Sequence, residues 1–219
     1  MNAALNAIYS DHKKFWSKEN MVLFLGGAVW FILALSVQRI AYNYIDNSVN
    51  GTHVGDLLLD NLPTLNLDFF IVQMPLLLTL LIIVLFIKNP AYLPFSLKTL
   101  SLFIIIRSFF ISLTHLGVNL HQIVLDTNVI GYGMYEFLYF AKNDFFFSGH
   151  VGAPFLFGLI FYQSPFWRCL FFAVSAIFGA SMIFAHMHYS IDIFAAPFIA
   201  YGVFIISKKL FKRDYALIQ

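Results

Sequence analysis

Two short stretches of this sequence hold residue types that could act together on a reacting group. His188 and Asp192 lie four residues apart, so their side chains share one face if the stretch is helical. A carboxylate beside an imidazole fixes the ring tautomer and stabilises the protonated form, which makes the other ring nitrogen a better nucleophile or base. His150 is a second imidazole that could protonate a departing oxygen. We therefore predict a catalytic set of His150, His188 and Asp192.

The residues just before His150 are suited to binding an anion. Ser148 and Gly149 let the chain approach an anion closely, and the serine hydroxyl adds a donor. If a helix begins here, its first backbone N–H groups and its positive dipole end suit a phosphate. Ser-Gly-His occurs by chance and His-x-x-x-Asp pairs are often structural, so neither stretch is strong evidence alone. The joint pattern is the basis of the prediction, with Ser148 and Gly149 as phosphate-binding residues.

Long apolar runs indicate which elements must position these residues. Hydrophobic residues make up 60% of the chain and charged residues 11%, against about 25% charged in a soluble domain. A helix needs roughly 20 mostly apolar residues to cross a bilayer. We predict an all-α, polytopic membrane protein with six transmembrane helices, from apolar runs at 21–37, 69–87, 99–117, 151–162, 169–185 and 193–207. The fourth and sixth helices begin in the polar stretches that contain the histidines.

The basic residues indicate how the predicted bundle is oriented. Ten of the 13 Lys and Arg residues lie before the first run, in the second and fourth connections, or after the last run. Lys and Arg in short loops favour the cytoplasmic side, so both termini are predicted to be cytoplasmic. The organisation is then a cytoplasmic segment (1–20), a transmembrane catalytic domain (21–207) and a basic cytoplasmic tail (208–219). Both reactive stretches lie at outward-facing helix starts.

Composition also excludes several classes of protein. The single cysteine, Cys169, rules out an intramolecular disulfide. The net charge of +2 is too small to suggest a nucleic-acid partner. The first 20 residues are polar and charged, unlike a signal peptide. The sequence leaves homo-oligomer formation open.

Three charged residues near the reactive stretches are candidates for binding phosphate. Arg107 lies in the middle of an apolar run, where it costs roughly 2.5–3.5 kcal/mol, so it must face the bundle interior. It would contact phosphate or pair with a buried acid such as Asp192 or Asp68. Lys142 could meet phosphate, although a solvated loop lysine is the plainer interpretation. Asp144 is predicted to orient the site or to cap the following helix.

A metal site is the less favoured alternative. His186 and His188 form a His-x-His pair, and catalytic zinc usually has three protein ligands. His150 and Asp192 could complete such a set, but we expect no metal and no cofactor. The sequence leaves open the role of His186 and whether Glu136 assists His150.

The same residues carry a resemblance to a known family. Residues 144–150 (DFFFSGH) resemble the third motif of the sphingomyelin synthases, and residues 185–192 (AHMHYSID) resemble their fourth motif. The resemblance spans about 60–210 and extends more distantly to the type 2 phosphatidic acid phosphatase superfamily. Val151 departs from the threonine of the synthase motif. Met182 stands where the phosphatases have an arginine, which favours the synthase branch.

The resemblance implies a two-step transfer of a phospho-head group. His188, activated by Asp192, would attack phosphorus, and His150 would protonate the departing diacylglycerol. Phosphocholine or phosphoethanolamine would pass to a lipid alcohol such as ceramide. The implied partners are membrane phospholipids and this lipid alcohol acceptor. With water as acceptor, the same residues would make a lipid phosphate phosphatase or a phospholipase C-type hydrolase.

Overall fold

A computed structural model of the chain describes residues 2–48, 51–139 and 143–219. Regular structure in these residues is helical, apart from one isolated bridge between Thr52 and Leu116. The segments long and apolar enough to cross a membrane are α2 (Lys18–Ser48), η1 with α3 (Phe69–Gln73, Met74–Lys88), α4 (Tyr92–Leu113), α7 (Pro165–Phe184) and α8 (Ser190–Leu210). The shorter helices are α1 (Asn2–Phe15), α5 (Tyr132–Tyr139), α6 (Gly149–Ile160), α9 (Lys212–Tyr215) and η2 (Ala216–Ile218). The all-α class is confirmed, and five candidate spans support a multi-pass membrane protein.

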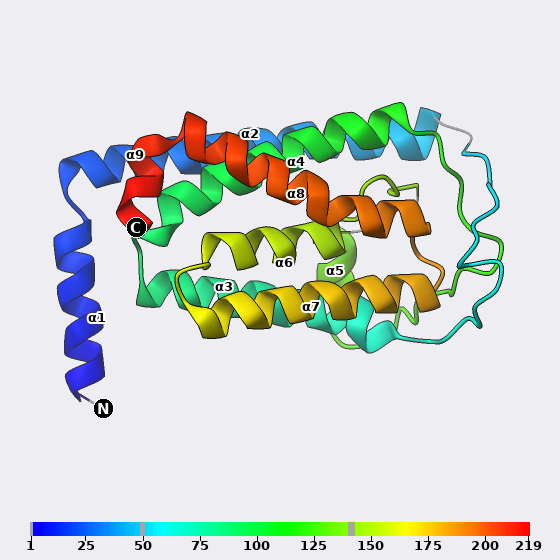
Figure 1. Cartoon of the computed structure of the whole chain (residues 1–219), viewed down its shortest axis with the longest axis horizontal. Helices are drawn as coiled ribbons and strands as arrows, with labels where there is room; N and C mark the ends of the chain where they lie inside the picture. The colour runs from blue at the N-terminus through cyan, green and yellow to red at the C-terminus, as the bar shows by residue number, and fades with distance from the viewer. Residues whose placement is uncertain (1, 49–50, 140–142) are drawn as a thin grey trace.

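The long helices form one bundle. Helices α2, α3, α4, α6, α7 and α8 run along its long axis, and successive helices point in opposite directions (Figure 1). Both ends of the chain lie at one end of the bundle, where α1 stands across the bundle axis. The connections before α3, between α4 and α5, and before α8 lie at the other end. This second end is called the loop end below. Helix α8 begins there, and α6 begins deeper in the bundle, beside the first turn of α8 (Figure 1).

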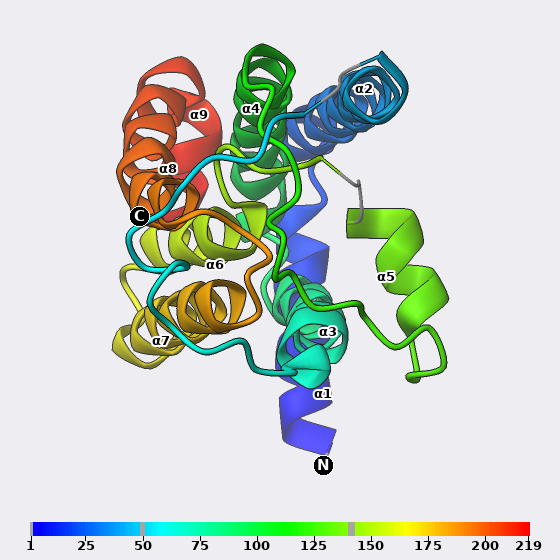
Figure 2. The ribbon, with the colours of Figure 1, turned by 90° about the vertical axis from the view of Figure 1, so that its right-hand side faces the viewer.

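Helix α6 lies among the other helices of the bundle and is shorter than predicted (Figure 2). It packs against α4, α7 and α8. A Cβ atom at Gly152 would lie 2.7 Å from the Phe103 ring, so the close packing of α6 on α4 requires glycine there. The 12 residues of α6 span about 18 Å, against about 30 Å for the hydrocarbon core. The fourth predicted helix therefore exists, but it is enclosed by its neighbours and is not among the five long spans.

The polar residues near the ends of the apolar runs extend the helices beyond the predicted limits. Helix α2 continues past Val37 to Ser48, and α4 begins at Tyr92 rather than Thr99. Lys98, expected in a cytoplasmic loop, is instead buried inside α4 and pairs with Asp214 at 2.5 Å between Nζ and Oδ1. Polar groups that form hydrogen bonds or ion pairs inside the bundle can be buried. A count of apolar runs does not predict which polar residues do so.

The C-terminal segment folds back onto the bundle. After α8 ends at Leu210, α9 and η2 return toward α4. The Tyr215 ring lies 5.0 Å from that of Phe95, and Ile218 is buried. The predicted basic tail is thus a docked segment, held by the buried Lys98–Asp214 ion pair.

Candidate active site

The predicted His188–Asp192 pair lies at the start of α8, where His188 precedes the cap residue Tyr189 and Asp192 lies in the first turn. Nδ1 of His188 lies 3.3 Å from Oδ2 of Asp192, and both side chains are buried. The backbone N–H of Tyr189, the residue that caps α8, donates to the same Oδ2 at 3.1 Å. A carboxylate fixed in this way favours the His188 tautomer with its proton on Nδ1. Nε2 is then the ring nitrogen available for chemistry.

The start of α6 brings His150 to the same place. Ser148 caps α6 because its Oγ accepts the backbone N–H of Val151 at 3.4 Å. The backbone N–H of Ser148 donates to the carbonyl oxygen of Asp192 at 3.1 Å, which ties the start of α6 to the first turn of α8. The ring centroids of His150 and His188 lie 6.4 Å apart, with 64° between the ring planes. The three predicted catalytic residues therefore form one cluster.

The two histidine rings are close enough to act on one phosphate group. Their centroids lie 6.4 Å apart in an edge-to-face arrangement, a separation typical of aromatic rings in contact. Attack begins with reacting atoms about 3–3.5 Å apart, and a proton donor works within about 3 Å of the oxygen it protonates, so a phosphate would have to lie beside the two rings rather than between them. The N-termini of α6 and α8 meet at this cluster, and their dipoles favour a negative charge there.

Arg107 on α4 binds the loop that precedes α6. Its Nη2 donates to Oδ1 of Asp144 at 2.6 Å, and its Nε donates to the carbonyl oxygen of Phe147 at 2.8 Å. A Cβ atom at Gly149 would lie 3.1 Å from Nε, so the loop packs directly on the guanidinium group. Arg107 thus pairs with an acid, as one alternative held, but with Asp144 rather than Asp192 or Asp68.

Asp144 does not cap α6, which was one of the two roles predicted for it. Both carboxylate oxygens are engaged, since Oδ1 accepts from Arg107 and Oδ2 accepts from the Tyr42 hydroxyl at 3.0 Å. Ser148 caps α6 in its place. Asp144 and Arg107 support the loop in this structure, and their predicted direct contact with phosphate stays a prediction. Lys142 lies outside the described residues.

Aromatic rings surround the histidines. The Phe145 ring meets His188 edge-on with 6.2 Å between centroids. Tyr135 on α5 and Phe178 on α7 each lie 6.0 Å from the His150 ring. These rings limit the access of water to the cluster, which strengthens electrostatic interactions inside it.

His186 points away from this cluster. It adopts a left-handed backbone conformation with φ of 54°, and its Nε2 lies 2.9 Å from the carbonyl oxygen of Leu59. Across the described ranges, no three His, Cys, Asp or Glu side chains converge as a metal-binding group. His186 is therefore a structural residue at the corner between α7 and α8. Glu136 is exposed on α5. Burial raises the pKa of Tyr132, and the negative charge of Glu136 raises it further.

Asp56 secures the start of α8 from the loop side. Its Oδ2 accepts the backbone N–H of Ser190 at 2.7 Å, and its Oδ1 accepts those of Leu58 and Leu59 at 2.9 and 3.2 Å. Burial by itself would raise the pKa of Asp56, but these donors outweigh it and hold the pKa below its usual value. Asp56 and Tyr42 were not predicted, because sequence spacing links neither of them to the histidines.

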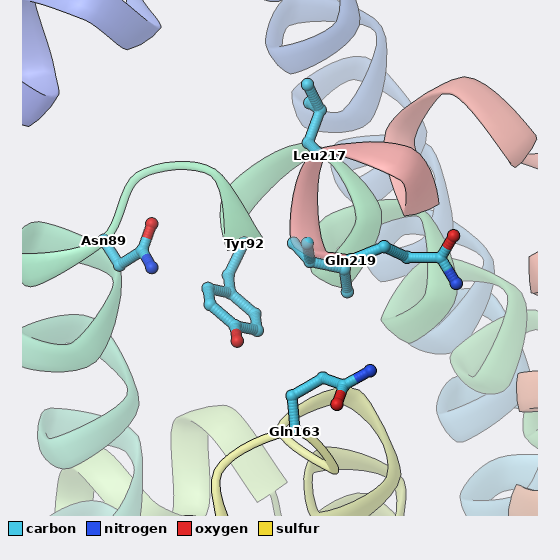
Figure 3. Close-up of a pocket in the computed structure, with 6 residues that line it drawn as sticks. Asn89, Tyr92, Gln163, Leu217 and Gln219 are labelled. Atoms are coloured by element: carbon cyan, nitrogen blue, oxygen red, sulfur yellow. The ribbon is translucent and has the colours of Figure 1, made fainter.

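The larger described cavity is not at this cluster. It has a volume of about 440 Å³, and it is lined by Asn89, Tyr92, Gln163 and the last three residues (Figure 3). These residues lie at the end of the bundle that holds the termini (Figure 1). A smaller cavity of about 250 Å³ lies beside the start of α8, between Tyr189–Ile191 and the loop around Asp56. The smaller cavity reaches Tyr189, the residue after His188, but neither cavity is lined by His150 or His188.

Comparison with known families points to the same helices. Residues 143–209 match the family described as PAP2 superfamily C-terminal. The matched residues, called the PAP2-like segment below, contain α6, α7 and most of α8, and therefore Ser148, His150, His188 and Asp192. Members of the superfamily are enzymes that act on lipid phosphates, whereas Arg107 and Tyr42 lie outside the matched residues. No curated protein and no solved structure matches the chain.

Proposed function

We propose that the protein is a membrane lipid phosphotransferase that moves a phospho-head group from a glycerophospholipid to a lipid alcohol such as ceramide. The observation that carries the proposal is the His188–Asp192 contact of 3.3 Å, which faces His150 across a 6.4 Å ring separation. The similarity of residues 143–209 to the PAP2 superfamily C-terminal family supports chemistry at a lipid phosphate. The charge distribution of the loops supports an extracytoplasmic site.

The proposed first step transfers the head group to the enzyme. Nε2 of His188 attacks phosphorus, and the bond from phosphorus to the diacylglycerol oxygen breaks. His150, protonated at this stage, donates its proton to that oxygen, so diacylglycerol leaves as a neutral alcohol. Asp192 stabilises the positive charge that develops on His188. The product is a phosphohistidine that carries the head group.

The second step returns both histidines to their starting states. A lipid alcohol gives its hydroxyl proton to His150 and attacks phosphorus, and the nitrogen–phosphorus bond to His188 breaks. The aromatic rings of Phe145, Tyr135 and Phe178 favour a lipid acceptor over water, since they limit solvent at the site. With water as acceptor, the same steps would make a lipid phosphate phosphatase or a phospholipase C-type hydrolase.

A product analysis tests this proposal directly. Purified protein is incubated with a mixed phospholipid pool, with and without ceramide, and the products are identified by lipid mass spectrometry. We expect a ceramide-dependent phospholipid together with an equal amount of diacylglycerol. We also expect the same turnover with and without a chelator. Release of a water-soluble phospho-head group, or of phosphate, irrespective of ceramide would assign the protein to the hydrolases, and absence of all these products would refute lipid phosphate chemistry.

A further inference from the structure

We propose that Tyr42 on α2 is a positioning residue of the active site, because it holds the ion pair that fixes the loop before His150. Neither the predicted reactive stretches nor the PAP2-like segment includes α2. The effect of Tyr42 on turnover rests on the proposed function. Its effect on the order of the loop does not, and the two are measured separately below.

The Tyr42 hydroxyl makes every hydrogen bond that a hydroxyl can make. It donates to Oδ2 of Asp144 at 3.0 Å, and it accepts from Nη1 of Arg107 at 3.2 Å and from Nε2 of Gln38 at 2.9 Å. A hydroxyl has one donor and two acceptor positions, so its geometry is fixed by three partners. The residue is buried, with 7% of its surface exposed. Few positions remain into which the Asp144 carboxylate could rotate.

The same network reaches the reactive histidine through the backbone. Arg107 binds both ends of a short loop, through the carboxylate of Asp144 and the carbonyl oxygen of Phe147. The next residue after that carbonyl, Ser148, caps the helix in which His150 is the second residue. Tyr42 orients both partners of the ion pair, so it sets where the loop ends and where α6 begins. We therefore assign to α2 a part in placing His150.

Removal of the Tyr42 hydroxyl takes one hydrogen-bond partner from each of three polar groups. In Tyr42→Phe, Oδ2 of Asp144 loses its donor, and Arg107 and Gln38 each lose an acceptor. A buried carboxylate oxygen without a donor is costly, so the loop is expected to sample other arrangements. Tyr44→Phe is a matched control, since Tyr44 lies two residues along the same helix with 41% of its surface exposed. The Tyr44 ring lies near that of His115 and is not part of the hydrogen-bond network around Tyr42.

Hydrogen–deuterium exchange measures the order of the loop without any substrate. We expect amide exchange in a peptide covering residues 143–151 to be about tenfold faster in Tyr42→Phe, which corresponds to the loss of roughly one hydrogen bond. Tyr44→Phe should exchange like the unmodified protein. If Tyr42→Phe fails to accumulate, Asp144→Asn weakens the same contact from the other side and should show the same acceleration. Unchanged exchange in the variant that accumulates would overturn the inference, whatever the substrate proves to be.

Turnover separates a positioning role from a purely structural one. A misplaced catalytic group lowers kcat by about 10- to 100-fold, so we expect this loss in Tyr42→Phe with KM little changed. Because Tyr42 acts through Asp144, the double variant with Asp144→Asn should be no slower than Asp144→Asn alone. Full kcat per folded molecule, or losses that multiply, would overturn the positioning role. A wild-type protein inactive on all lipids, but with faster loop exchange in Tyr42→Phe, would instead count against the proposed function alone.

Discussion

The backbone N–H of Ser148 donates to the carbonyl oxygen of Asp192, with 3.1 Å between nitrogen and oxygen. This bond joins the cap of α6 to the first turn of α8, two elements separated by the whole of α7. It places His150 and His188 side by side, with 6.4 Å between their ring centroids. Because the bond uses backbone atoms, substitution of either histidine should leave the positions of the helix starts intact. This makes single substitutions in the site informative about chemistry rather than folding.

We expect the two histidines to differ in their effects. His188→Ala should abolish transfer and leave no covalent phosphoryl group on the protein, since the nucleophile is gone. His150→Ala should slow turnover of lipids, whose alkoxide leaving group needs a proton, by about 10²–10⁴-fold. It should matter less for a p-nitrophenyl substrate with a good leaving group. Rates on both substrates, with acid-quenched trapping of labelled intermediate, test this. Label that accumulates in His188→Ala but not in His150→Ala would reverse the assignment.

Asp192→Asn should reduce turnover steeply while it preserves the shape of the site. The carboxylate stabilises the charged form of His188, which an amide cannot do, so we expect a loss on the order of 10²–10⁴-fold in kcat. Asp214→Asn is the matched control, because Asp214 is also buried but pairs with Lys98 at the opposite end of α8. It should lower the melting temperature and leave kcat per folded molecule unchanged. Equal effects of the two variants on kcat would argue against a chemical role for Asp192.

Gly149→Ala should disturb the site through Arg107. The added methyl group would lie 3.1 Å from Nε and 3.2 Å from Cζ of Arg107, and three hydrogen-bond partners hold that guanidinium group in place. We expect kcat to fall by about tenfold or more, since small displacements of catalytic groups are costly. Gly202→Ala is the control, because a methyl group there meets no atom within 4 Å. It should keep activity and stabilise α8 by up to about 1 kcal/mol. Thermal melts and initial rates of both variants provide the comparison.

Arg107→Ala is expected to act on stability as well as on activity. It leaves the Asp144 carboxylate buried without its cation, which costs about 3–5 kcal/mol. Arg107→Lys should recover only part of the lost stability and activity, because lysine lacks the planar fork that binds Asp144 and Phe147 together. Arg107→Ala combined with Asp144→Ala should regain stability but not turnover. An Arg107→Ala protein of normal melting temperature and no activity would favour direct phosphate contact instead.

The orientation of the bundle can be tested by cysteine labelling. In a Cys169→Ser background, single cysteines are placed at Val124, which is 91% exposed at the loop end, and at the exposed Lys212 near the C-terminus. An impermeant maleimide applied to intact cells should label position 124 at once. It should reach position 212 only after permeabilisation. The reverse pattern would place the histidines on the cytoplasmic side and overturn the proposed topology.

The sequence by itself determined the local parts of the site. The spacing of His188 and Asp192 predicted their contact, although a shared helix face is not its cause, because His188 precedes the cap of α8 and Asp192 lies in the first turn. The polar stretch before the fourth apolar run predicted a helix start, and α6 begins at Gly149, capped by Ser148 rather than by the expected Asp144. The long uncharged runs likewise predicted the all-α class and, among six expected helices, the five long spans. Each of these features depends on interactions between residues close together in the chain.

Only the tertiary structure decided which distant residues meet. The apolar helices resemble one another in sequence, so their order in the bundle cannot be read from composition, and packing chose Asp144 over Asp68 and Asp192 as the partner of Arg107. Packing also recruited Tyr42 from a helix without any reactive residue. Packing against α4, α7 and α8 also encloses α6, so this helix of 12 residues does not need the length of a membrane span. A buried polar group binds whichever partner the fold places within hydrogen-bond distance. The distance between two residues far apart in the chain cannot be read from their spacing in the sequence.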